Sequence, residues 1–118
     1  MSTSDSTCLL FVQMTAKPDQ EQAFNQWYEQ EYIPAFARDI PGIVRARRFA
    51  TLSPDASGTH TYLTIYEFRD EATLHRGLEV MKSREQWRQA WKEWEGRAVA
   101  SISDGLFRTT AHVAGVEA

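Results

Sequence analysis

The sequence has few of the residues that build covalent or metal-bound scaffolds. Its 118 residues include one cysteine, Cys8, so no disulfide can form within the chain and no multi-cysteine metal site is available. Histidine pairs with metal-binding spacing and clustered carboxylates are missing, and the six glycines form no phosphate-binding loop pattern. We therefore expect no metal and no organic cofactor, and the single cysteine is typical of a reducing compartment.

Excess positive charge and long apolar runs are missing as well. The formal net charge is −3, so the composition gives no indication of a basic surface that would bind nucleic acid. The small group Arg45, Arg47 and Arg48 is interpreted as a solvated strand face. No segment approaches the roughly 20 apolar residues that span a bilayer, and residues 1–7 do not resemble a leader peptide. These absences predict a cytoplasmic protein without nucleic-acid or membrane partners.

The composition indicates one globular domain. The chain is 42% hydrophobic, and no Gly/Ser-rich or Pro-rich linker divides it. We expect the domain to cover residues 8–113, with flexible tails at 1–7 and 114–118.

What the sequence does contain is an aromatic stretch with helical spacing. Phe24, Tyr28 and Tyr32 recur every four residues, which places three rings on one helical face. Pro18 suits the first turn of this helix, and Pro34 biases the residue before it away from helical geometry. The helix is therefore expected to end near Tyr32.

Four short runs rich in β-branched and aromatic residues predict strands at 8–14, 43–52, 60–68 and 106–113. The second run follows Pro41-Gly42, a pair that suits a tight turn. Together with two helices, these strands give the order βαββαβ.

The second helix is expected to begin after Asp70, which is placed to cap it. The pattern predicts an interruption near Gly77 and a restart at residues 83–86, which have capping-box form. Beyond that point four residues recur at helical spacing and are interpreted mainly as core contacts: Trp87, Trp91, Trp94 and Ala98.

The order βαββαβ predicts a ferredoxin-like α+β fold, in which a four-stranded antiparallel sheet carries two helices on one face. The strands are nevertheless apolar on both faces. In the first strand Leu9 and Phe11 point to the face opposite that of Leu10. In the third strand Leu63 and Ile65 point to the face opposite that of Tyr62, Tyr66 and Phe68. Because strands of this kind are covered on both faces, we expect a homodimer whose partner supplies the second cover.

The same residues resemble the EthD-like group of the dimeric α+β barrel superfamily. In that group the first helix carries an aromatic residue, a tyrosine four residues later and then His-x-Pro, with Pro-Gly before the second strand. The matching positions are Phe24, Tyr28, Tyr32-Ile33-Pro34 and Pro41-Gly42, and the likeness extends loosely over residues 8–113. The resemblance implies a cleft for small aromatic or polyketide-like molecules, and relatives include cyclases, isomerases, cofactor-free oxygenases and proteins without known activity.

This chain departs from the family pattern at Tyr32, which stands where the pattern has a histidine. A tyrosine, with an ordinary pKa of about 10, is a poor base at neutral pH. Glu67 shares a strand face with Leu63 and Ile65, where an apolar surrounding would suit proton abstraction. The alternative for Glu67 is a carboxylate at the wet end of the strand, paired with an arginine.

The candidate catalytic residues are therefore Glu67, Tyr32 and His75, the last because the second helix borders the cleft in relatives. Some superfamily members bind haem through a helix histidine, which would again nominate His75. The expected substrate contacts are aromatic: Phe11, Trp27, Tyr28, Tyr66 and Trp87.

Two functions follow from these expectations. One is a cofactor-independent enzyme that acts on a hydrophobic aromatic or polyketide-like molecule by proton transfer, as an isomerase, cyclase or oxygenase. The other is a non-catalytic protein that shelters a small ligand.

Overall fold

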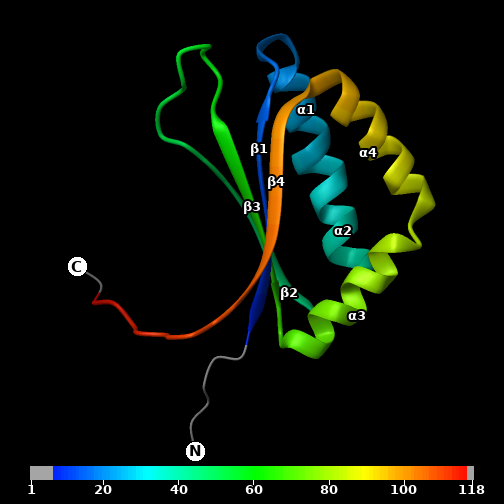
Figure 1. Cartoon of the computed structure of the whole chain (residues 1–118), viewed down its shortest axis with the longest axis vertical. Helices are drawn as coiled ribbons and strands as arrows, with labels where there is room; N and C mark the ends of the chain where they lie inside the picture. The colour runs from blue at the N-terminus through cyan, green and yellow to red at the C-terminus, as the bar shows by residue number, and fades with distance from the viewer. Residues whose placement is uncertain (1–6, 117–118) are drawn as a thin grey trace, which may run out of the picture.

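Four strands form a sheet that helices cover on one side, in the computed structural model, which describes residues 7–116 (Figure 1). The strands lie in the order β2-β3-β1-β4, and all neighbours are antiparallel. In chain order the elements are β1 (Cys8–Ala16), η1 (Pro18–Gln20), α1 (Glu21–Trp27), η2 (Tyr28–Tyr32), α2 (Ile33–Asp39), β2 (Ile43–Ala50), β3 (Thr61–Phe68), α3 (Glu71–Lys82), α4 (Glu85–Ala98) and β4 (Val99–Arg108). This is the expected ferredoxin-like α+β fold.

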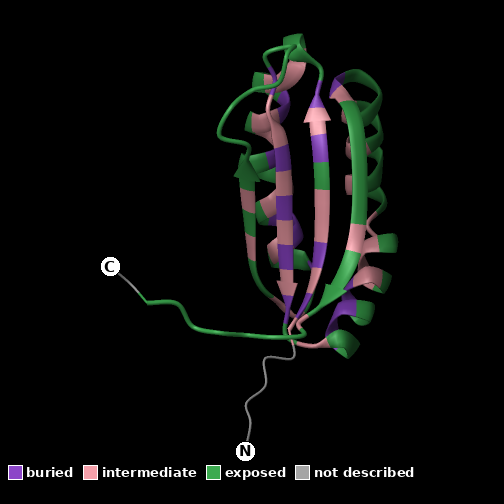
Figure 2. Cartoon of the chain, turned by 60° about the vertical axis from the view of Figure 1, so that its left-hand side comes forward, coloured by how far each residue is buried: buried purple, intermediate pink, exposed green. Residues whose placement is uncertain are grey.

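Side-chain alternation along β1 and β3 builds the core. Leu10 lies opposite Tyr66 and Met14 lies opposite Tyr62, and all four side chains are buried under the helices. Burying one large apolar side chain stabilises the fold by about 1.5–3 kcal/mol. The alternate residues of both strands project from the other face, which Figure 2 views with the strands in front of the helices. The prediction that apolar residues occupy both faces of these strands is confirmed.

The prediction that the first helix ends near Tyr32 is wrong. The chain stays helical to Asp39, and Ile33 has helical backbone angles of φ −61° and ψ −46°. The continuation is possible because η2 is a π-turn: the amide of Ile33 donates to the carbonyl of Tyr28, five residues back. The wider turn seats Pro34, which has no amide hydrogen, at the start of α2, where Phe36 is buried.

The second helix also differs from the prediction. Asp70 caps α3 by accepting a hydrogen bond from the amide of Thr73 at 2.8 Å, as expected. The helix continues through Gly77, because the missing side chain lets the backbone approach Phe68 and Ile40. The break falls at residues 83–84, and no capping box forms there, since the hydroxyl of Ser83 donates to the carbonyl of Val80 instead.

The last strand lies earlier than predicted. β4 spans Val99–Arg108 rather than 106–113, with Ile102, Asp104 and Leu106 opposite Met14, Val12 and Leu10. The polar residues before position 106 were not part of the predicted strand, but β4 is an edge strand, where polar and charged side chains are well tolerated.

The expected tails fall mostly at or beyond the ends of the described range, and residues 1–6 and 117–118 lie outside it. Thr7 belongs to the fold, since its carbonyl accepts a hydrogen bond from the amide of Thr109 at 3.1 Å. Within residues 7–116, no helix has the length and apolar character needed to cross a membrane.

Candidate functional site

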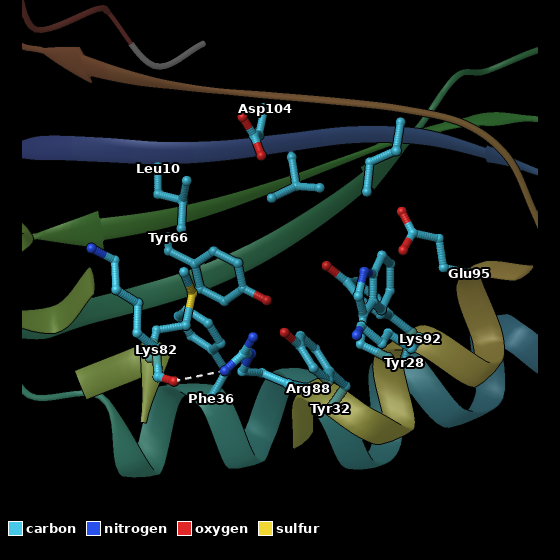
Figure 3. A pocket seen from close by; sticks show the side chains of 14 residues that line it. Leu10, Tyr28, Tyr32, Phe36, Tyr66, Lys82, Arg88, Lys92, Glu95 and Asp104 are labelled. Carbon is cyan, nitrogen blue, oxygen red and sulfur yellow. Dashed lines mark hydrogen bonds between the residues drawn. The ribbon is translucent and has the colours of Figure 1, made fainter. Parts of the chain in front are cut away.

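A cavity of about 570 Å³ lies between the sheet and the helices (Figure 3). Strands β1, β3 and β4 form one wall, and η2, α2 and the two later helices form the other. Apolar and aromatic side chains make up most of its surface: Leu10, Val12, Tyr28, Tyr32, Phe36, Tyr66, Met81, Trp91 and Ile102. Five charged residues complete it: Lys82, Arg88, Lys92, Glu95 and Asp104. A mostly apolar cleft with a few polar groups is the usual form of a small-molecule site.

Three tyrosine hydroxyls converge inside the cavity. Tyr28 and Tyr32 come from the helical side and Tyr66 from β3, and Figure 3 shows their hydroxyl groups pointing toward one another. The hydroxyls of Tyr66 and Thr64 are buried and make no hydrogen bond of standard geometry within residues 7–116, although both lie close enough to the Tyr28 hydroxyl to affect its pKa. Because buried polar groups are nearly always paired in native proteins, the hydroxyl of Tyr66, which lines the cavity, is suited to bind a ligand oxygen.

Burial keeps the three phenols protonated. It raises the pKa of Tyr28, of Tyr32 and of Tyr66, since the charged phenolate would lose its hydration. The nearby hydroxyls of Thr64 and Tyr66 and the charge of Arg48 offset part of the shift in the pKa of Tyr28. At neutral pH the three hydroxyls therefore act as hydrogen-bond donors rather than as bases.

The π-turn sets the positions of two of these rings. Tyr28 and Tyr32 are the first and last residues of η2, and their rings stack with centroids 5.2 Å apart and planes 13° apart. A π-turn rotates the two residues relative to each other compared with an α-helix, and such turns often occur at functional sites. The turn therefore brings two parallel phenols to one wall of the cavity.

Arg48 supports this wall from behind. Its side chain is 5% exposed, and its guanidinium group donates to Asn25 Oδ1 and Glu29 Oε2, each at 2.8 Å. The interpretation of Arg45, Arg47 and Arg48 as one solvated strand face is thus wrong for Arg48. Strand alternation turns it toward the helices, whereas Arg45 and Arg47 stay exposed.

Of the residues predicted from sequence, the structure brings Tyr28, Tyr32 and Tyr66 together in the cavity. Trp27 and Trp87 contact the ring of Tyr32, with ring centroids 5.3 Å and 5.8 Å from its centroid.

The remaining three predicted residues lie elsewhere. Glu67 and Phe11 project from the other sheet face, where Glu67 binds Arg45 at 2.7 Å and Phe11 contacts the ring of Phe107 with centroids 5.0 Å apart. His75 is exposed on α3, with Nε2 lying 3.4 Å from a carboxylate oxygen of Glu71.

Sequence reasoning missed the charged residues of the cavity. Arg88, Lys92 and Glu95 recur with Trp91 at helical spacing along α4, so they were identifiable as part of one face. Asp104 was missed because the predicted last strand began only at residue 106, although Asp104 alternates with Ile102 and Leu106 as a strand residue does. Within residues 7–116, no cluster of three or more metal-ligating side chains occurs.

Solved structures with this fold include proteins of several kinds. A monooxygenase from Streptomyces coelicolor in complex with nanaomycin D has a TM-score of 0.68 at 9% identity, over 95% of both chains. A dimeric ferredoxin-like protein from an uncultured marine organism has a TM-score of 0.64 at 9% identity, over 91% of this chain and 98% of the other. A mutant form of SnoaB, a cofactor-independent oxygenase from Streptomyces nogalater, has a TM-score of 0.60 at 14% identity, over 92% of this chain and 97% of the other. Identities this low show a shared fold alone.

Comparison with curated proteins gives no match. A family model described as "Domain of unknown function (DUF4286)" matches residues 7–103, which is most of the chain. The protein therefore belongs to the DUF4286 family.

Proposed function

We propose that the protein binds a small hydrophobic molecule, aromatic or polyketide-like, in this cavity and acts on it by proton transfer without a metal or organic cofactor. The observation that carries the proposal is the hydroxyl of Tyr66, which is buried, makes no hydrogen bond of standard geometry within the described residues and points into the cavity beside Tyr28 and Tyr32. A substrate carbonyl or phenol oxygen would supply the acceptor that this hydroxyl lacks.

The chemistry would divide between donors and a base. The hydroxyls of Tyr66 and Tyr32 would donate to a substrate oxygen and stabilise the negative charge that develops on it when a neighbouring carbon or hydroxyl loses a proton. Asp104 lines the same cavity from β4 and is the candidate acceptor of that proton. Return of the proton at another carbon would complete an isomerisation. In a cyclisation the carbanion would attack a carbonyl carbon of the same molecule, the C=O π bond would break, and the proton would go to that oxygen.

This proposal keeps Tyr32 from the sequence-based assignment and moves the acid–base role from Glu67 and His75 to Asp104, because only Asp104 lines the cavity. Support comes from two neighbours of the same fold, one described as a monooxygenase with a bound ligand and one as a cofactor-independent oxygenase. Kinship with the EthD-like group, suggested by the aromatic and Pro-Gly pattern, is part of the same proposal.

A second candidate function is ligand binding without conversion. The residues that line the cavity include no histidine, and the pKa of each lining tyrosine is raised away from neutral pH by burial. Asp104 is then the only proton acceptor opposite the tyrosines on the strand side, so its role decides between the two functions.

We also propose that the protein is a homodimer joined through the open sheet face. Apolar side chains there are partly or largely exposed, including Phe107 at 55% and Phe49 at 43%. Leu9, Phe11 and Ile65 lie among them on the same face. Contiguous apolar surface of this kind usually marks an interface, and a dimeric protein is among the structural neighbours.

The test of function uses nanaomycin D as the binding ligand and polycyclic phenols and ketones as candidate substrates. Binding is followed through tryptophan fluorescence, and turnover through absorbance. Tyr66→Phe is expected to weaken binding about tenfold, because it removes the free donor. Asp104→Asn is expected to abolish turnover while binding persists. Glu67→Gln, on the other sheet face, is the matched control and should change neither.

Binding without turnover of any compound, unchanged in Asp104→Asn, would favour the binding protein over the enzyme. Turnover that survives Asp104→Asn at the wild-type rate would remove Asp104 as the base.

A further inference from the structure

The cations that line the cavity make no close ion pair within residues 7–116, unlike five arginines elsewhere in the chain. Five arginines that do not line the cavity each hold a carboxylate oxygen at 2.7 to 3.0 Å: Arg38, Arg45, Arg48, Arg84 and Arg108. The three cations of the cavity, Lys82, Arg88 and Lys92, come from the end of α3 and from α4 and lack a partner this close. Positive charge on the helix side of the cavity is therefore available to a ligand, although the net charge of the chain is −3.

The ion pairs that two of these cations do make are weak. Lys82 lies 3.3 Å from Glu79, and Arg88 lies 3.4 Å from Glu85; the members of each pair are three residues apart on one helix, and every side chain is more than half exposed. Solvent-exposed ion pairs of this kind contribute little to the free energy of folding. Lys92 has no ion pair with any residue that the structure describes.

The acids of the cavity do not neutralise these cations. Asp104 projects from β4, on the strand side in Figure 3, while Lys82 and Arg88 lie on the helix side. No ion pair joins Asp104 or Glu95 to a cavity cation within residues 7–116. The cavity thus presents a cationic corner on one wall and a separate carboxylate on the other.

We propose that the natural ligand is an aromatic carboxylic acid whose carboxylate is held by Arg88 and Lys92. A guanidinium group binds a carboxylate through two parallel hydrogen bonds, and a nearby ammonium group adds a third donor. The ring system would then lie against Trp91 and the tyrosines, with a ring oxygen at the hydroxyl of Tyr66. This inference rests on the proposed function, since it places the ligand in the same cavity.

The test compares hydroxynaphthoic acid with its neutral amide, because the two differ mainly in charge. Affinities are measured by titration calorimetry at pH 7.5 and low ionic strength. A charge-assisted contact is expected to make the acid bind about tenfold tighter than the amide. The preference should shrink as salt is added, because both cations reach solvent.

The double variant Arg88→Gln, Lys92→Gln should reduce the preference to about twofold, mainly by weakening the binding of the acid. Arg76→Gln is the control, since Arg76 is an exposed cation on α3 that does not line the cavity. Equal binding of acid and amide by the wild-type protein would overturn the inference and leave the proposed function standing. A preference that survives in the double variant would also overturn it, and failure of both compounds to bind would remove both proposals.

Discussion

The guanidinium carbon of Arg48 lies 4.7 Å from the centroid of the Tyr28 ring. It also lies 4.1 Å from the centroid of Tyr62, so the cation sits between aromatic faces rather than in water. Nε and one terminal nitrogen of Arg48 have no hydrogen-bond partner within residues 7–116, which leaves the rings as their neighbours. A buried cation beside a cavity tyrosine affects both stability and titration.

Replacing Arg48 by methionine is expected to lower the free energy of unfolding by about 1–3 kcal/mol, because cation–π contacts and buried packing are lost. It should also raise the pKa of Tyr28 and of Tyr66 further, since the positive charge of Arg48 favours both phenolates. Urea unfolding and the absorbance of tyrosinate against pH measure the two effects. Arg76→Met, at an exposed position on α3, is the control and should change stability by less than about 0.5 kcal/mol. An unaltered tyrosine titration in Arg48→Met would contradict the electrostatic role.

The buried phenols predict a loss of stability in alkali. Because burial raises the pKa of Tyr28, Tyr32 and Tyr66 in the folded state, the unfolded chain releases these protons at lower pH than the folded one. Stability is therefore full below the unfolded pKa of about 10 and falls as the pH rises above it. Urea unfolding between about pH 8 and pH 11.5 measures the decline. Tyr66→Phe should make the decline shallower, and an equally steep decline in that variant would argue against the contribution of Tyr66.

Much of the fold was predictable from short-range patterns. Alternation fixed the two faces of β1 and β3, and Asp70 marked the start of α3. The end of the first helix was not predictable from Pro34, because the buried side chains of Ala35 and Phe36 favour helical continuation and a π-turn removes the conflict with proline. Tertiary packing decided the outcome there.

The candidate site was predictable in part for a similar reason. Helical and strand periodicity grouped Tyr28, Tyr32 and Tyr66 on surfaces that face each other. The same alternation placed Glu67 on the other face, but sequence alone does not say which face borders a cavity. Asp104 lies on a polar edge strand, whose composition resembles that of a turn.

Pro34 is expected to maintain the π-turn. Pro34→Ala restores an amide hydrogen that can donate to the carbonyl of Gln30, four residues back, and so allows an ordinary α-helix. The stacked geometry of Tyr28 and Tyr32 should then change, and ligand affinity should fall severalfold while thermal stability is kept. A crystal structure of the variant and a fluorescence titration measure these effects. Pro18→Ala, at the start of η1, is the control. An identical ring geometry in Pro34→Ala would show that the turn does not depend on the proline.

Gly77 is expected to be essential for the packing of α3 on the sheet. A Cβ atom there would lie 2.7 Å from a ring carbon of Phe68 and 2.8 Å from a methyl carbon of Ile40. Gly77→Ala should therefore lower the free energy of unfolding by about 1–3 kcal/mol, despite the better helix propensity of alanine. Gly96→Ala in α4 is the matched control, because no atom lies within 4 Å of the added carbon. The control should gain about 0.5–1 kcal/mol, and a gain in both variants would mean that α3 moves away from the sheet at little cost.

A substitution at Phe107 tests the proposed homodimer. Its ring is 55% exposed on the open sheet face, in contact with Phe11, so a facing copy would bury both. Phe107→Glu places a charge in that interface, where desolvation costs several kcal/mol, and is expected to shift the protein from dimer to monomer at micromolar concentration. Sedimentation velocity measures the shift. Leu52→Glu, a fully exposed loop position, is the control and should remain dimeric. A wild-type protein that sediments as a monomer over the same concentrations would show that the apolar face is not covered by a second copy.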